Sequence, residues 1–171
     1  MKYSMLLLLS IVLFSSCQKS GSNSSTNNTN TQNYFKVGTD EYVIANAYYD
    51  VDSINNFSFL VFSTPNLNWN TAIGDLQGSG NFIEFDIEDI SDTLKQGNLL
   101  NPAQFWAAVT FNYVYPIYPT GGIDQDIDDN FPGYLNITRT NSNYEIHFQF
   151  KLTTGRIVQG VYIGRVQRIY Q

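Results

Sequence analysis

Residues 144–152 read Tyr-Glu-Ile-His-Phe-Gln-Phe-Lys-Leu, and their apolar side chains fall at every second position. Successive side chains of a β-strand point to opposite faces of its sheet, so this alternation predicts a strand with one face in a core and one in water. Residues 82–88, Phe-Ile-Glu-Phe-Asp-Ile-Glu, have the same period. Neither segment has the spacing of three to four residues that is typical of an amphipathic helix.

The period of two continues from Tyr34 onward, with Gly, Asn, Asp and Pro between the segments. Further strands are predicted at residues 34–37, 42–49, 57–62, 105–115, 134–139 and 156–168. One short helical turn is expected at 101–105, where Pro102 occupies a first helical position. About seven or eight antiparallel strands indicate a single all-β domain, either a sandwich or a small lipocalin-like barrel.

The beginning of the chain predicts a signal peptide over residues 1–16. Lys2 precedes an apolar run at 5–14, which is too short to span a bilayer as a helix but suits a signal-peptide core. Residues 13–17, Leu-Phe-Ser-Ser-Cys, resemble the lipobox of bacterial lipoproteins, whose cysteine receives a diacylglycerol and becomes the new N-terminus. The resemblance implies that Cys17 is lipidated. The alternative is an ordinary secretory signal followed by a free thiol.

Residues 17–33 are polar after the cysteine and predict a flexible tether to one domain at 34–171. Gln18, rather than Asp, follows the cysteine, which by resemblance to other lipoproteins favours sorting to the outer membrane. Surface lipoproteins of Bacteroidetes often carry an acidic cluster just after the cysteine. This sequence has none there, so the periplasmic leaflet is favoured over the cell surface.

The charge of the chain argues against nucleic acid as a partner. Removal of Lys2 with the signal peptide leaves eight bases against fifteen acids, a net charge of −7. One cysteine and one histidine also exclude chemistry that needs clustered His or Cys ligands. His147 alternates with the apolar side chains of its strand, so it is expected at the surface.

Several segments together resemble small Bacteroidetes lipoproteins with an all-β domain and no established activity. They are Asn81-Phe-Ile-Glu-Phe-Asp-Ile, Asp92-Thr-Leu with Gly97, Gly133-Tyr-Leu-Asn-Ile-Thr, Asn143-Tyr-Glu-Ile-His-Phe and Gly160-Val-Tyr-Ile-Gly. The resemblance covers the second half of the domain better than the first. Two tripeptides, Asp-Ser-Ile and Asp-Thr-Leu, also resemble the O-glycosylation site of exported Bacteroides proteins, which implies Ser53 and Thr93 as the acceptors.

Three acids, Glu84, Asp86 and Glu88, share one strand face, and alternate residues lie roughly 6.5 to 7 Å apart along a strand. This separation suits the acid and base of an inverting glycosidase. Alternating acids are also how a half-exposed strand avoids edge pairing, and this is the preferred interpretation. No catalytic residue is therefore assigned.

Asp124, Asp126 and Asp128 resemble the start of a calcium loop, since acids at alternate positions can converge on one cation. The pattern departs from an EF-hand at Asp129, which replaces the required glycine, and at Leu135, which replaces the closing glutamate. Calcium is thus a candidate cofactor, and an isolated acidic loop is the preferred interpretation.

Two long loops are predicted at 64–81 and 116–133, and such loops often carry binding residues. Trp69 and Trp106 are candidates for stacking on a sugar ring, and Trp69, in the first loop, is the better one. Trp106 opens a strand, where a core or barrel-rim position is preferred, and packing is the default role for aromatic residues of a β protein. The sequence as a whole predicts a lipid-anchored outer-membrane binding or accessory module without catalysis, whose ligand is a glycan, a small apolar molecule or an envelope protein. The alternatives are a carbohydrate hydrolase and a purely structural envelope lipoprotein.

Overall fold

The computed structural model describes residues 33–52, 57–88, 93–115 and 123–169. This part of the chain contains thirteen strands and no helix, so the prediction of an all-β fold is confirmed. The described residues likewise contain no helix that is long and apolar enough to cross a membrane.

Six strands form one antiparallel sheet. In spatial order they are β2 (Asp40–Val43), β1 (Tyr34–Val37), β12 (Ile157–Gly164), β11 (Asn143–Lys151), β10 (Tyr134–Thr140) and β7 (Gly97–Leu100). In β11 the apolar positions of the strict alternation are buried and the others are half-buried or exposed, as its sequence predicts.

The other strands form a seven-stranded sheet. In order they are β13 (Gln167–Arg168), β3 (Asn46–Asp52), β4 (Phe57–Ser63), β6 (Asp75–Glu88), β8 (Phe105–Val114) and β9 (Ile123–Asp126), with β5 (Leu67–Asn70) paired to the first part of β6. The pairing of β13 with β3 is parallel, and the other pairings are antiparallel.

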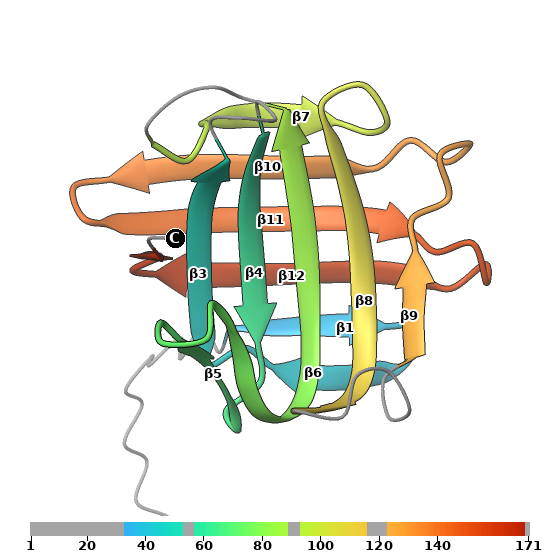
Figure 1. Cartoon of the computed structure of the whole chain (residues 1–171). Helices are drawn as coiled ribbons and strands as arrows, with labels where there is room; N and C mark the ends of the chain where they lie inside the picture. Colours follow the sequence, from blue (N-terminus) through green and yellow to red (C-terminus); the bar gives the residue numbers. More distant parts are fainter. Residues whose placement is uncertain (1–32, 53–56, 89–92, 116–122, 170–171) are drawn as a thin grey trace, which may run out of the picture. The chain divides into compact units, whose positions relative to one another are not determined.

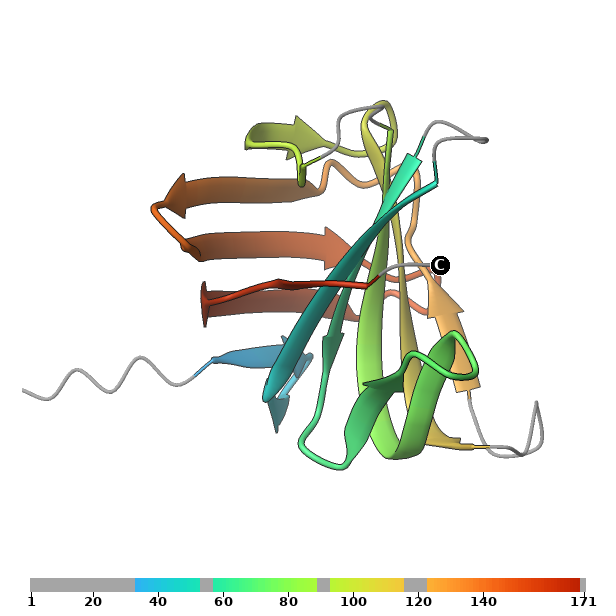
Figure 2. The same ribbon diagram turned by 60° about the vertical axis from the view of Figure 1, so that its left-hand side comes forward.

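The two sheets face each other, and the strands of one run across those of the other (Figures 1 and 2). This is the crossed form of sheet-on-sheet packing. The space between the sheets is filled by aromatic rings, among which Phe62, Phe85 and Phe148 are almost fully buried and have ring centroids 5.2–6.0 Å apart. The fold is therefore a sandwich, and its rings occupy the space in which a lipocalin-like barrel would hold a ligand.

Strand β6 belongs to two pairings because it bends along its length. Its first residues pair with β5, and its later residues pair with β4 and β8, with a register shift between Gly80 and Phe82. Gly78 has φ +117°, and a Cβ there would collide with the carbonyl oxygen of Asn66. Glycine thus permits the bend that makes β5 and the first part of β6 a hairpin, hereafter the β5–β6 hairpin. Figure 2 shows this hairpin standing out from the sheet on the side away from the core.

Several details differ from the sequence prediction. The segments 64–81 and 116–133 were expected to be loops, but the first contains β5 and the start of β6 and the second contains β9. The strands expected at 42–49 and 156–168 are each divided in two, as β2 and β3 and as β12 and β13. Residues 101–103 form a single turn closed by a bond from the N–H of Gln104 to the carbonyl of Leu100, 3.0 Å, and β8 follows at once, so a turn is present where one was expected but it is not assigned as a helix. The strand count exceeds seven or eight because short strands such as β5, β7 and β13 lack a full period of alternation.

Candidate functional site

The outer face of the seven-stranded sheet, which is turned away from the core, combines aromatic rings with carboxylates. Across β3, β4 and β6, Asp50 pairs with Phe59 and Phe59 with Asp86. In the next row Tyr48 pairs with Val61 and Val61 with Glu84. An antiparallel sheet with one face in a core usually presents a polar second face, so the apolar residues here need a cover or a ligand.

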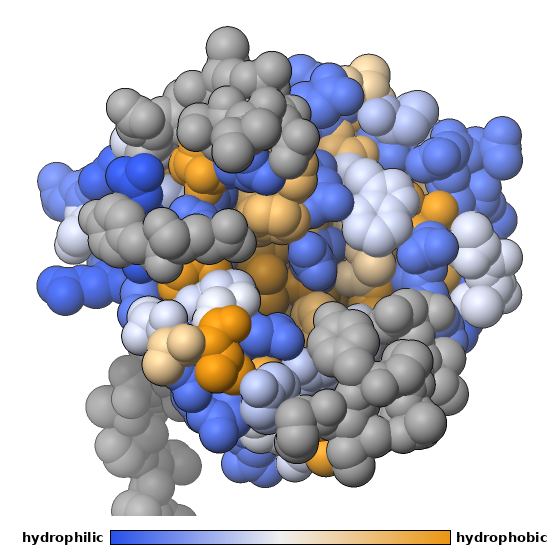
Figure 3. Space-filling model, viewed as in Figure 1, coloured by the Kyte–Doolittle hydropathy of each residue, from blue (hydrophilic) through white to orange (hydrophobic). Residues whose placement is uncertain are grey.

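A hollow of about 210 Å³ lies on this face beside the β5–β6 hairpin; we call it the outer hollow. Figure 3 shows a recess near the middle of this face, with hydrophobic residues in it and hydrophilic residues around it. The lining residues are Asp50, Phe59, Val61, Trp69, Asp75, Leu76, Phe82, Glu84 and Ile169. They come from β3, β4, β5 and β6 and from the residue after β13, so the bend of β6 is what encloses the space.

A second apolar cluster lies between the β5–β6 hairpin and the outer face of the sheet, next to the outer hollow. Its buried members are Tyr48, Val61, Leu67, Leu76, Phe82, Tyr113 and Ile169. It is separate from the main core between the sheets. The hairpin therefore packs on the sheet through its own small core, which holds the walls of the outer hollow in place.

Trp69 lies on β5 rather than in a loop. Its backbone N–H donates to the hydroxyl of Tyr48 over 3.1 Å, and the two rings are tilted with centroids 6.3 Å apart. The indole Nε1 is buried without a hydrogen-bond partner. A buried N–H without an acceptor lowers the free energy of unfolding. The indole is therefore not placed here only to stabilise the fold.

Three carboxylates line the outer hollow, from Asp50, Asp75 and Glu84. Asp50 is only 6% exposed, and its Oδ1 accepts the N–H of Val51 over 2.8 Å. The Oδ1 of Asp75 accepts the N–H of Leu76 over 2.7 Å. Among the described residues that line the hollow, none is basic.

The three acids of the hydrolase alternative do not share one cavity. Glu84 lines the outer hollow, whereas Asp86 and Glu88 are not among its lining residues. Glu88 is exposed at the end of β6. Asp86 is half-buried, burial raises the pKa of its carboxyl, and its Oδ1 has no hydrogen-bond partner. The arrangement thus separates the carboxyl with the raised pKa from the cavity that would hold a substrate.

Trp106 is on the outer face and is 37% exposed, so it does not lie in the core. The reason is the alternation of β8, in which Phe105 and Ala107 take the buried positions. Trp106 pairs with Asp86 in register, but it is not a lining residue of the outer hollow.

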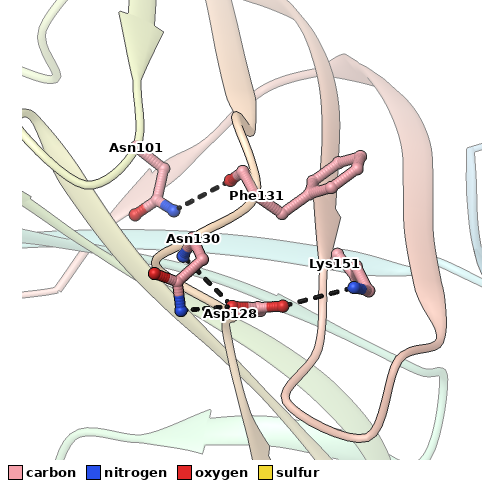
Figure 4. A network of polar contacts seen from close by, with 5 residues as sticks. All are labelled: Asn101, Asp128, Asn130, Phe131 and Lys151. Atoms are coloured by element: carbon pink, nitrogen blue, oxygen red, sulfur yellow. Dashed lines mark hydrogen bonds and ion pairs between the residues drawn. The ribbon is translucent and has the colours of Figure 1, made fainter.

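The acidic segment at 124–128 is tied to the six-stranded sheet by Asp128 (Figure 4). Its Oδ1 accepts the N–H of Asn130 over 3.1 Å, and its Oδ2 lies 3.3 Å from Nζ of Lys151. The bond from the N–H of Asn130 is the main cause that lowers the pKa of the Asp128 carboxyl, and Lys151 adds to it. Asn101 donates to the carbonyl of Phe131 over 3.4 Å in the same region.

The calcium prediction involves two further acids. Asp126 is exposed at the end of β9, with buried Ile127 between it and Asp128, and the side chain of Asp124 is outside the described residues. No group of three or more His, Cys, Asp or Glu in the described part of the chain is arranged to hold a metal ion. Asp128 already has a cationic partner in Lys151.

The remaining candidates from the sequence lie apart from the outer hollow. His147 is exposed on the outer face of the six-stranded sheet, and its Nε2 lies 2.8 Å from Oε1 of Glu145. Thr93 is exposed, whereas Cys17 and Ser53 are outside the described residues. No match is found when the chain is compared with protein families, curated proteins and solved structures.

Sequence reasoning missed Asp50, Phe59 and Asp75 as lining residues. One signal was present: residues 57–62, Phe-Ser-Phe-Leu-Val-Phe, are apolar at nearly every position rather than at every second one. Such a run indicates a strand whose two faces are both covered. It marks β4 as the strand that lies beneath a second apolar layer.

Proposed function

We propose that this protein is a lipid-anchored binding module of the outer membrane, which acts without catalysis and takes a small ligand into the outer hollow. The observation that carries the proposal is the hollow itself, which joins aromatic rings and carboxylates beside a second apolar cluster. Concave sites with an apolar lining and a few converging polar groups are the usual form of small-molecule sites.

The size of the outer hollow limits the ligand. At about 210 Å³ it is smaller than the typical range of about 300–1,000 Å³ for drug-sized ligands. A single sugar ring or a molecule of similar size is therefore the expected occupant. The rings of Phe59, Trp69 and Phe82 offer apolar surface, and the carboxylates accept hydrogen bonds from hydroxyl or amino groups.

Two other versions of the function have less support. An apolar carrier would need its cavity between the sheets, where the rings of Phe62, Phe85 and Phe148 pack against one another. A hydrolase would need its acid and base in one cleft, and Asp86 is not among the residues that line the hollow with Glu84.

The anchoring part of the proposal rests on the lipobox resemblance at residues 13–17. Mass spectrometry of the membrane-extracted protein is expected to find a diacylglycerol on Cys17, and the Cys17→Ala variant is expected to lack the acyl mass and to leave the membrane fraction. An identical mass and location for the two proteins would overturn the anchor.

The binding part can be tested with the two tryptophans of the chain. In full-length protein in detergent, Trp106→Phe leaves Trp69 as the single indole reporter at the hollow, and Trp69→Phe leaves Trp106 as the matched control. Both are titrated with a panel of neutral, amino and acidic monosaccharides and of small amines, alcohols and carboxylic acids. A saturable change in the emission of Trp69, with none in that of Trp106, is the expected result.

The control for catalysis is the same protein incubated with chromogenic glycosides. No release of the chromophore is expected, because the proposed site binds without an acid and base pair. If no member of the panel changes the emission of Trp69, the outer hollow is not a small-ligand site. If chromophore is released by the wild type and not by Glu84→Gln, the hydrolase alternative replaces the binding module.

A further inference from the structure

We infer that the outer face of the six-stranded sheet holds a second binding site, which takes a short neutral saccharide chain between the rings of Tyr34 and Tyr134. The inference goes beyond the proposed function, because this site is on the other sheet and shares no described lining residue with the outer hollow. It is carried by three observations: a hollow between the two rings, the polar groups that line it, and the pairing of the charges around it.

A hollow of about 270 Å³ lies on this face; we call it the tyrosine hollow. In Figure 1 the six-stranded sheet lies behind the other sheet, so this face is turned away from the reader. The floor of the hollow is the pair of Phe148 on β11 and Gly160 on β12. Phe148 is buried in the core, and a Cβ at Gly160 would collide with its ring. Both side-chain positions thus face inward, so backbone alone covers the sheet here while the neighbouring positions carry side chains outward.

Two aromatic rings stand at the sides of the tyrosine hollow. Tyr34 is on β1 and pairs with Val161, which pairs with His147. Tyr134 is on β10 and pairs with Gln149. The strand order β1-β12-β11-β10 places the backbones of the two tyrosines three inter-strand steps apart, roughly 14 Å at about 4.8 Å a step. A single sugar ring is shorter than this separation, whereas a chain of linked rings can pack on both tyrosines.

The ring of Tyr34 is held in place by a neighbour on its own strand. Nζ of Lys36 lies 5.2 Å from the centroid of this ring and 2.8 Å from Oε2 of Glu41. A cation over a ring face is attracted to it, so the ring of Tyr34 loses little freedom when a ligand packs against it. Tyr134 is exposed beside the same hollow. The two rings therefore offer apolar surface for the apolar faces of pyranose rings.

Groups that can bond to sugar hydroxyls lie between the two rings. His147 and Gln159 both line the tyrosine hollow and are exposed. Nε2 of His147 lies 2.8 Å from Oε1 of Glu145. A carboxylate only accepts, so the neutral imidazole carries its proton on Nε2 and leaves Nδ1 as an acceptor. The amide of Gln159 both donates and accepts, as a sugar hydroxyl does.

The charges around the tyrosine hollow are paired within the protein. Lys36 is paired with Glu41, and Glu145 is paired with the imidazole of His147. Among the described residues that line the hollow, none is Asp, Glu, Lys or Arg. An ionic ligand would lose hydration here without gaining an opposite charge. A neutral ligand with many hydroxyl groups is therefore the class that fits the lining.

The test uses His147 as its reporter, because it is the single histidine of the chain. Full-length protein with isotope-labelled histidine is prepared in a detergent that has no sugar head group, and the ring signals of His147 are followed by NMR at constant pH. The neutral probes are cellotetraose, laminaritetraose, maltotetraose and mannotetraose, with glucose as the single ring and tetragalacturonate as the acidic chain. At least one neutral chain is expected to shift the His147 signals saturably and to bind about tenfold or more tightly than glucose or tetragalacturonate.

The variants separate the two rings from the rest of the face. Tyr134→Ala is expected to weaken binding of that chain about tenfold or more and Tyr34→Ala about fivefold or more, whereas Tyr134→Phe keeps the ring and should stay within about threefold. Leu100→Ala is the matched control, because Leu100 is exposed, pairs in register with Tyr134 and does not line the hollow. Its expected change is less than about twofold. Thermal unfolding of each variant checks that the fold is retained.

Unchanged His147 signals with all four neutral chains would overturn the inference and leave standing the proposed function, which is tested through Trp69 on the other sheet. Equal loss in Tyr134→Ala and Leu100→Ala would also overturn it, because the saccharide would then adhere to the face in general. An equal response to glucose, tetragalacturonate and the neutral chains would have the same consequence. A change in the emission of Trp69 without a change at His147 would assign the saccharide to the outer hollow instead.

Discussion

At the scale of the residue, Asp86 is the ionisable group with the clearest energetic cost. It lies on the outer face of β6, paired in register with Phe59 and Trp106, and burial raises the pKa of its carboxyl. The folded protein therefore holds this proton more tightly than the unfolded chain does. The protonated carboxyl of Asp86 therefore contributes to the free energy of unfolding at low pH. This contribution is lost as the pH rises from the ordinary pKa of Asp, about 3.9, through the raised pKa of the folded protein.

We expect Asp86→Asn to raise the thermal midpoint at neutral pH and to leave it nearly unchanged near about pH 3, because only the ionised carboxyl is penalised. Thermal unfolding at both pH values measures the difference. Glu88→Gln, an exposed acid two residues away on the same face, is the control. A lower midpoint for Asp86→Asn at neutral pH would show that the carboxylate is stabilising.

Asp128 leads to a different expectation, about metal. Its carboxylate already bonds to the N–H of Asn130 and lies 3.3 Å from Nζ of Lys151. Calcium would have to displace this lysine, so the thermal midpoint is expected to be the same with millimolar Ca²⁺ and with a chelator. Binding of a metal to the folded state alone would raise the midpoint with concentration. A rise of several degrees with Ca²⁺ would favour the calcium loop over the ion pair.

At the scale of the element, the β5–β6 hairpin depends on the backbone of Gly78. We expect Gly78→Ala to cost about 1–3 kcal/mol of unfolding free energy, because its φ of +117° strains other residues and the new methyl group collides with Asn66. Urea denaturation measures the cost. The same variant should weaken ligand binding, since the hairpin forms a wall of the outer hollow.

Gly74→Ala is the matched control for Gly78→Ala. Gly74 has φ +67° at the tip of the same hairpin, and nothing lies within 4 Å of an added Cβ. Its expected cost is about 1–2 kcal/mol, from the left-handed backbone alone. Ligand affinity should be kept. Equal loss of affinity in both variants would mean that the hairpin does not position the site.

The elements also show how much could be read from the sequence. The predicted bounds of β1 agree with the structure, and those of β8, β10 and β11 agree within one residue, because one face of each contributes buried side chains to the core. The β5–β6 hairpin was missed because three glycines and several polar residues in 66–81 hide its alternation. The outer hollow could not be predicted because its walls depend on how β6 bends, which is a tertiary effect.

At the scale of the whole molecule, the apolar side chains form two layers with different roles. The main core holds the two sheets together, and the smaller cluster lies under the hairpin on the outer side. Stability and binding should therefore respond to different substitutions. Phe85 belongs to the first layer, with rings of Phe105 and Phe148 centred 6.0 and 5.2 Å away, and Phe59 belongs to the outer face.

We expect Phe85→Ala to lower the unfolding free energy by about 3–5 kcal/mol, because it leaves a cavity in a closely packed core. Phe59→Ala is expected to cost about 1 kcal/mol, since its ring is half-buried, but to reduce ligand binding in the outer hollow about fivefold or more. Denaturant titration and the fluorescence assay measure the two effects. A large loss of stability and no loss of binding in Phe59→Ala would place its ring in the structural layer instead.

The register between β1 and β12 also determines when the domain can form. Tyr34 pairs with Val161 and Val37 with Val158, so β1 cannot form this pairing until β12, near the end of the described chain, has been synthesised. Before that strand is synthesised, β1 has only β2 as a partner, and a two-stranded ribbon is marginal in water. Chains that end before Ile157 are therefore expected to be digested rapidly by protease, whereas chains that extend through Ile169 resist it. A domain that closes this late stays unfolded until nearly all of its described residues have been synthesised.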